Sequence, residues 1–185
     1  MTIYVGVDQA LQKMGVCVLV DGAPDVLKLI KPPPKLTGPD RLQKLRDLLQ
    51  TALEPYRGRI TGAAVEGQSY GSLGDLDGLG QVLGVVQVLL TDMGAAPWKV
   101  PPALLKQFVT GKGNATKPQM REATLARWKL DIDQDDICDA HGLARIAEEI
   151  HEQTSQDRIQ VDAVRRLTHK KPRRPRLKKL FTKSI

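Results

Sequence analysis

Residues 2–8 read Thr-Ile-Tyr-Val-Gly-Val-Asp, an alternation of apolar and small residues that stops on an acid. A period of two predicts a β-strand, and the acid marks the point where the strand leaves the core. A second β-rich run occupies residues 14–20, and Asp21-Gly22 is a hairpin signal that leads to a third strand near residues 26–31. Three prolines at 32–34 end this strand, because proline cannot donate a ladder hydrogen bond. The chain therefore opens with a three-stranded meander.

Beyond the meander, helix and strand patterns alternate. Two further strands are predicted, one at residues 60–66 that ends on Glu66 and a short one at residues 98–100. Leucines at helical spacing, glycine-containing aliphatic runs and a proline at a first turn predict the helices. These helices are expected at residues 42–53, 79–93, 101–108, 118–128 and 135–152. The order predicts an α/β protein with a ribonuclease H-like fold, a five-stranded mixed sheet flanked by helices.

The length of 185 residues suits one compact domain with an appendage. We expect the domain at residues 1–155 and a basic extension at residues 156–185. Ten Lys or Arg and no acid lie between Ala163 and Ile185, whereas the rest of the chain is slightly acidic. Such a segment favours a polyanion as its partner, because each cation that contacts a phosphate releases condensed counterions. A solubilising or targeting tail is the simpler alternative.

The composition also excludes some classes of protein. No apolar stretch approaches the ~20 residues that span a bilayer, and the first residues lack the pattern of a secretory signal. Two cysteines, Cys17 and Cys138, do not make a disulfide framework, which favours a reducing compartment. We therefore expect a cytoplasmic protein without a membrane partner.

Acids follow two of the predicted strands at the point where each ends. Asp8 closes the first strand and Glu66 closes the fourth. An acid at a strand end is usually a solvated turn residue. If the two strands are parallel neighbours, however, both acids emerge at one edge of the sheet, where α/β sheets collect their functional residues.

The predicted helix at residues 135–152 supplies further acids. Asp139 shares a helix face with Asp136, three residues away, and equally with Asp135, four residues away, so periodicity leaves the choice open. Asp135 and Asp136 can also simply cap the helix. Clustered carboxylates repel one another, and a divalent cation offsets that repulsion. Their hard oxygens favour Mg²⁺, with Mn²⁺ as a substitute, and two such ions support phosphodiester hydrolysis.

Three motifs resemble the RuvC family of Holliday-junction resolvases. Asp8 ends Tyr-Val-Gly-Val-Asp, Glu66 lies in Ala-Ala-Val-Glu-Gly-Gln, and Asp136 and Asp139 are spaced by three. Leu-Gly-Gln-Val-Leu-Gly at 79–84 resembles a family helix, and residues 105–117 resemble a stretch of the form V-K-x-x-V-x-G-x-G-x-A-x-K. The resemblance implies a homodimer that cuts four-way and other branched DNA by paired nicks. It implies four metal ligands and catalytic residues: Asp8, Glu66, Asp136 and Asp139.

The same resemblance assigns the DNA contacts. Lys106 and Lys117 match the two family lysines that approach DNA, and Tyr70 is the nearest candidate for the family's aromatic wedge. The remaining expected contacts are Lys112 in the Gly- and Lys-rich loop and three arginines of the extension, Arg173, Arg174 and Arg176. The sequence departs from the family where Gln9-Ala10 replaces Pro-Gly after the first acid. This altered turn and the compact size resemble phage-encoded relatives, which would act in a bacterial host cytoplasm.

Other functions remain as alternatives. A transposase of this fold ends its acidic triad in Glu, where this chain has Asp139, and a ribonuclease H carries Asp at the position of Glu66. A protein that binds nucleic acid through its basic tail without cutting it is the alternative from a different class. Loss of cutting with retained binding in a carboxylate variant discriminates these hypotheses.

Overall fold

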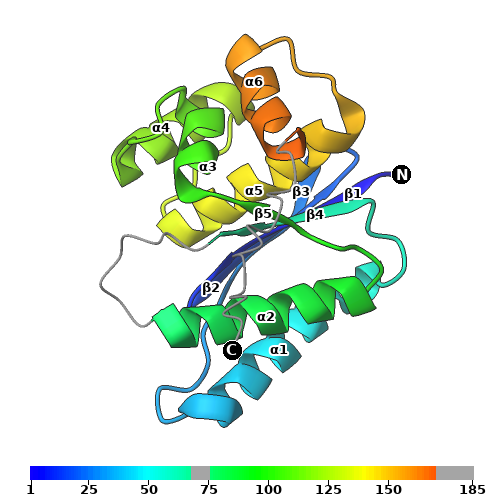
Figure 1. Ribbon diagram of the computed structural model, residues 1–185, viewed down its shortest axis with the longest axis vertical. Helices are drawn as coiled ribbons and strands as arrows, with labels where there is room; N and C mark the ends of the chain where they lie inside the picture. The colour runs from blue at the N-terminus through cyan, green and yellow to red at the C-terminus, as the bar shows by residue number, and fades with distance from the viewer. Residues whose placement is uncertain (68–75, 170–185) are drawn as a thin grey trace, which may run out of the picture.

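A computed structural model describes residues 1–67 and 76–169. Its centre is a five-stranded sheet with the order β3-β2-β1-β4-β5 (Figure 1). β1 pairs antiparallel with β2 and parallel with β4, and β5 continues the parallel side. The strands are β1 (Ile3–Gln9), β2 (Met14–Val20), β3 (Ala23–Ile30), β4 (Gly62–Glu66) and β5 (Trp98–Val100). The predicted mixed sheet is confirmed.

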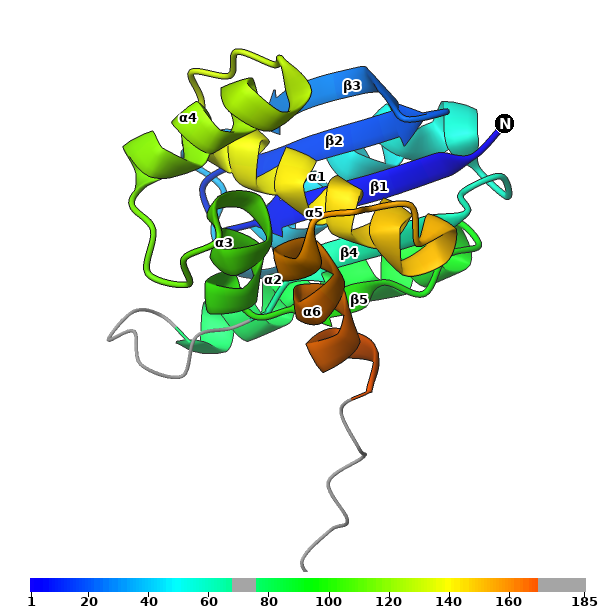
Figure 2. The ribbon, with the colours of Figure 1, turned by 90° about the horizontal axis from the view of Figure 1, so that it is seen from above.

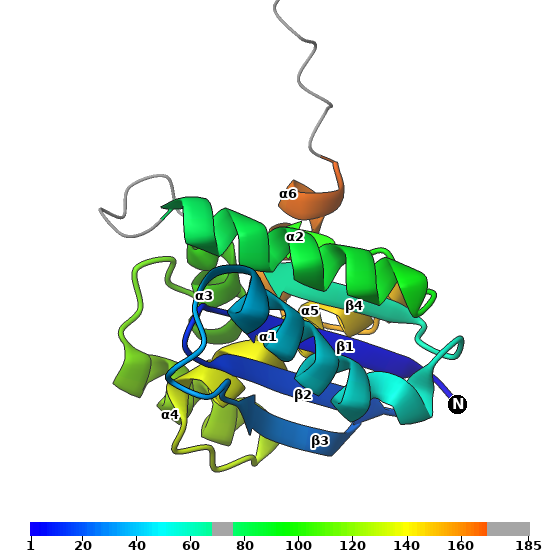
Figure 3. The same cartoon turned by 90° about the horizontal axis from the view of Figure 1, so that it is seen from below.

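Helices cover both faces of this sheet. In Figure 3, α1 and α2 lie across one face, whereas Figure 2 shows α5 lying across the other, beside α3, α4 and α6. The helices are α1 (Gly38–Leu53), α2 (Leu76–Asp92), α3 (Pro102–Thr110), α4 (Lys117–Trp128), α5 (Asp135–Glu152) and α6 (Arg158–Thr168), with a 3-10 turn at Glu54–Tyr56. None of the helices in the described ranges is long and apolar enough to cross a membrane.

The alternation of β1 divides the core into two layers. Ile3, Val5 and Val7 are buried in the layer with α1 and α2, while Tyr4 is buried in the layer with α5. Successive side chains of a strand point to opposite faces, so the period of two in the sequence corresponds directly to these layers. Aliphatic side chains dominate both layers, in a chain with only 4% aromatic residues.

Two glycines bring α5 against the sheet. A Cβ atom on Gly6 would overlap the carbonyl oxygen of Ala140, and one on Gly15 would overlap the carbonyl oxygen of Asp136. Any larger residue would push the helix away, because backbone atoms cannot yield as a flexible side chain can. These glycines in β1 and β2 therefore set where the first turns of α5 lie.

The helix α6 is the element that the sequence patterns did not predict. Asp157 caps it by accepting a hydrogen bond from the Ile159 amide at 2.8 Å, and Ala163 is fully buried. α6 packs against α3 and α5, and Arg166 donates to the side chain of Gln107 at 3.1 Å. The basic extension therefore begins as a packed helix.

Candidate active site

The register of β1 and β4 places their terminal acids side by side. β1 and β4 are parallel, and Val7 pairs with Val65, so Asp8 and Glu66 each lie one residue further along neighbouring strands. Both acids fall on the face that buries Tyr4 and Ala64 against α5. The condition on which the sequence prediction rested, parallel neighbouring strands, is thus met.

The first two turns of α5 lie over this edge. Asp136 makes the close contact with Gly15 through its backbone carbonyl, and Asp139 is one turn further along the helix. Asp136 and Asp139 both contribute to the electrostatic environment of Asp8. Asp135 instead pairs with cations of α4, with its carboxylate 3.1 Å from Lys117 Nζ and 3.4 Å from Arg121 Nε.

Three of these carboxyl groups bind protons more tightly than ordinary acids do. Burial and the charges of Glu66, Asp139 and Asp136 raise the pKa of Asp8 well above its usual value, and a side-chain hydrogen bond with Glu66 adds to the rise. Burial and Asp139 raise the pKa of Glu66 to about 7. Burial and the neighbouring aspartates raise the pKa of Asp139 to about 6. Negative charge at this edge is therefore costly until a cation compensates it.

Lysines border the acids on the α3–α4 side. Glu66, Asp139 and Asp135 line a cavity of about 200 Å³ together with Lys106 and Lys117. The ammonium groups of Lys106 and Lys117 lower the pKa of Asp139 and so oppose the effect of burial. Lys112 is exposed in the loop between α3 and α4, outside this cavity. The structure thus brings two of the three expected lysines to the acids.

Two side chains at this edge were not predicted from the sequence. Lys13, in the turn between β1 and β2, forms an ion pair with Asp136. Gln9, which stands where the family has proline, donates from Nε2 to the carbonyl oxygen of Glu66 at 2.6 Å. The signal for both was their closeness in sequence to Asp8. Gln9 fastens the end of β1 to the end of β4 and thereby helps to hold the two acids together.

The donor set fits a hard divalent cation, because every candidate ligand is a carboxylate oxygen. Among the residues that the structure describes, no three His, Cys, Asp or Glu side chains are gathered closely enough to form a preformed metal group.

Cys138 lines the same cavity as Glu66 and Asp139, whereas His141 packs away from it against Trp128. Cys138 contacts the hydroxyl of Thr124 at 3.2 Å, and His141 accepts a hydrogen bond from Arg145 at 3.2 Å. The imidazole is fully buried. Burial lowers the pKa of His141 to about 3, so the ring is neutral.

Solved structures share this architecture. The structure of Thermus thermophilus RuvC matches with a TM-score of 0.66 at 22% identity, over 77% of this chain and 91% of that chain. T. thermophilus RuvC in complex with a Holliday junction substrate matches with a TM-score of 0.66 at 23% identity, over 78% and 91% of the two chains. The fold is that of RuvC.

A sequence match agrees with the RuvC fold. The crossover junction endodeoxyribonuclease RuvC of Brevibacillus brevis is 34% identical over 110 residues, which cover 57% of this chain and 64% of that protein. No family model matches the chain. The resemblance to RuvC that the motifs predicted is thus found independently in a relative and in solved structures.

Some predicted contacts lie outside the described residues. These are Tyr70 and the three arginines Arg173, Arg174 and Arg176. The structure brings the acids at the sheet edge and two α3–α4 lysines close together, but their roles, like those of the candidate wedge and the arginines of the extension, stay predictions.

Proposed function

We propose that this protein is a metal-dependent, structure-selective DNA endonuclease that resolves Holliday junctions and other branched DNA. One observation carries the proposal: on a RuvC fold, Asp8 and Glu66 end neighbouring parallel strands beneath the acidic first turns of α5. The Brevibacillus brevis relative is a crossover junction endodeoxyribonuclease, and T. thermophilus RuvC forms a complex with a Holliday junction, which supports the same activity and substrate for this chain.

We assign the metal ligands to the carboxylates Asp8, Glu66, Asp136 and Asp139. Mg²⁺ suits these oxygens best, and Mn²⁺ is the expected substitute. When bound, such ions supply an activated water and charge stabilisation for phosphodiester hydrolysis. Glu66 and Asp139 are partly buried, which limits competition from bulk water. Lys106 and Lys117, on the rim of the same cavity, attract and orient the backbone phosphates.

The proposed reaction also implies an assembly. Two symmetric nicks across a four-way junction require two sites, and this chain carries one carboxylate cluster in its described part. A homodimer provides the second site by symmetry. Further attraction to the phosphate backbone, independent of DNA sequence, comes from the ten cations between Ala163 and Ile185, which include Arg173, Arg174 and Arg176.

Asp8→Asn tests this function. We expect metal-dependent nicking of a labelled four-way junction to fall by about a thousandfold or more. The reason is that Asp8, the proposed ligand next to Glu66 and the aspartates of α5, is lost. Junction binding in chelator is expected to persist, since the lysines remain. Nicking and binding are measured on the same purified variant, with linear duplex as the comparison substrate.

Asp47→Asn is the matched control, because Asp47 is an exposed aspartate on α1 and the substitution is chemically identical. It is expected to leave both nicking and binding unchanged. Undiminished cutting by Asp8→Asn would refute the site, and wild-type protein that binds junctions without cutting would favour a non-catalytic binding protein.

A further inference from the structure

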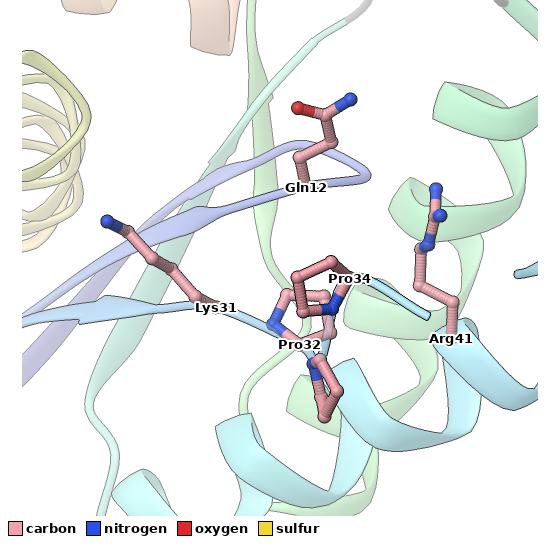
Figure 4. Close-up of a pocket in the computed structure, with 6 residues that line it drawn as sticks. Gln12, Lys31, Pro32, Pro34 and Arg41 are labelled. Atoms are coloured by element: carbon pink, nitrogen blue, oxygen red, sulfur yellow. The ribbon is translucent and has the colours of Figure 1, made fainter. Parts of the chain in front are cut away.

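A second cavity lies outside the carboxylate cluster. It measures about 580 Å³ and is lined by Gln12, Lys31, Arg41 and the three prolines 32–34. Figure 4 shows Pro32 and Pro34 between Lys31 on one side and Arg41 on the other, with the amide of Gln12 across the opening. No acid is among the residues that line it. The cavity thus presents cations and an amide around an apolar floor.

The cavity shares one end of the sheet with the acids but belongs to the other layer. Gln12 follows the end of β1, four residues after Asp8, and Lys31 directly follows the end of β3. Arg41 lies in the first turns of α1. In Figure 1, α1 lies on the opposite side of the sheet from α3 and α4, which carry Lys106 and Lys117. Cations therefore flank the acidic edge on both sides.

Lys13 joins the two regions. Gln12 lines the cavity while the next residue, Lys13, forms an ion pair with Asp136 of the carboxylate cluster. The β1–β2 turn therefore runs from the cavity directly to the acids. The Lys13 side chain is 44% exposed, so its positive charge is also open to solvent between the two places.

The lining is held in place before any ligand arrives. Arg41 is half-buried, and its Nε donates to the carbonyl oxygen of Leu36 at 2.7 Å, which fixes the guanidinium and leaves its terminal nitrogens as donors. The prolines have fixed φ angles, so little conformational entropy remains to be lost on binding. A fixed guanidinium that shares a cavity with a lysine is suited to bind phosphate oxygens.

We propose that this cavity binds the phosphate backbone of the DNA arm that leaves the carboxylate site on the α1 side. The inference rests on the proposed function, because it takes branched DNA as the ligand. Lys106 and Lys117 contact backbone in one layer, and Lys31 and Arg41 contact it in the other. The cluster then lies between two phosphate-binding surfaces, as a branch point with two arms requires.

Charge removal in the cavity tests the inference. The double variant Lys31→Gln/Arg41→Gln is titrated onto a labelled four-way junction in chelator over a series of KCl concentrations. Loss of two phosphate contacts is expected to lower affinity about tenfold and to reduce the slope of log affinity against log salt by about 2. Lys31 is exposed, so Lys31→Gln alone should reduce the slope by about 1 even if Arg41 proves necessary for folding.

Arg59→Gln/Lys129→Gln is the matched control. Arg59 precedes β4, at the end of the sheet away from Glu66, and its side chain donates to the carbonyl oxygen of Pro55 much as Arg41 donates to that of Leu36. Lys129 donates to the carbonyl oxygen of Ala126 at 3.2 Å. The control should bind as the wild type does.

The outcomes separate this inference from the proposed function. Wild-type affinity and salt slope in both Lys31 variants overturn the cavity as a DNA site, whether or not the protein cuts. Absence of metal-dependent nicking by the wild type refutes the proposed function. A reduced salt slope in the Lys31 variants, with an unchanged slope in the control, supports the inference. This holds whether or not the protein cuts, because the titration requires no catalysis.

Discussion

Both ends of α5 carry acids, but the acid that faces the sheet edge, Asp139, lacks the partners that the glutamates have. At the carboxyl end every glutamate has a donor of its own: Tyr4 donates to Glu152 at 2.5 Å, Arg145 to Glu148 at 2.8 Å and the Ser155 amide to Glu149 at 2.9 Å. At the amino end Asp139 faces Asp8 and Glu66, and within the described ranges no Lys or Arg forms an ion pair with any of these three.

This difference separates structural acids from functional ones. A partly buried carboxylate with a donor recovers the hydration that it loses on folding. The cluster of Asp8, Glu66 and Asp139 has no cation paired with it in the described residues, so a cation that the protein binds would have to compensate its charge. The carboxyl end of α5 therefore stabilises the fold, whereas negative charge near its amino end is left without a paired cation.

Asp139→Asn is the substitution for which we expect the largest effects, on nicking and on stability in opposite directions. Nicking is expected to fall about a thousandfold, because a metal ligand is lost. The melting temperature of the metal-free protein should nevertheless rise by a few degrees, because one of the repelling charges is gone. Both are measured on one preparation, by junction cleavage in Mg²⁺ and by thermal unfolding in chelator.

Glu152→Gln is its counterpart at the other end of α5. The loss of the hydrogen bond from Tyr4 should lower the free energy of unfolding by about 1 kcal/mol and leave nicking unchanged. If Asp139→Asn lowers the metal-free melting temperature as Glu152→Gln does, the two ends of the helix do not differ as argued.

Asp136→Asn and Asp135→Asn compare the two aspartates in the first turn of α5 as candidate metal ligands. Asp136 acts on the carboxyl of Asp8, whereas Asp135 pairs with Lys117 and Arg121. We therefore expect nicking to fall by about a hundredfold for Asp136→Asn and by only a few-fold for Asp135→Asn. Calorimetric titration with Mn²⁺ should show weakened binding in the first variant alone. Equal losses in both would make Asp135 a ligand too.

Much of the fold was predictable because its signals are local. Alternation gave β1 and β2, the prolines after β3 ended the meander, and β5 and α5 begin and end where the patterns indicated. The helix α2 begins at Leu76, three residues before its predicted start. The helix α6 was missed because its basic residues dominated the composition of the extension, whereas its docking depends on Ala163 meeting α3 and α5.

The candidate site likewise has some features that the sequence predicts and others that depend on how helices pack. Asp8 and Glu66 could be placed together from strand ends on the condition that the two strands are parallel neighbours, because α/β sheets collect functional residues at the carboxyl ends of such strands. The environment of Asp135, held by Lys117 and Arg121 of α4, depends on how two helices pack and has no sequence signature. Helical spacing alone left Asp135 and Asp136 equal. The ion pair between Lys13 and Asp136 likewise joins residues far apart in the chain.

The smallest expected effect is the pH dependence of the metal-free protein. Folding raises the pKa of Glu66 from 4.5 to about 7 and that of Asp139 from 3.8 to about 6. Between these limits the folded protein holds protons that the unfolded chain has released, so the free energy of unfolding falls as pH rises. In chelator the wild type should therefore lose a few degrees of melting temperature between about pH 5 and pH 7. Asp139→Asn should lose less, because one shifted carboxyl is removed and the repulsion that raises the other is weakened. Equal losses in the two proteins would mean that the acids at the sheet edge do not repel one another, and the contrast between the ends of α5 would then lose its electrostatic basis.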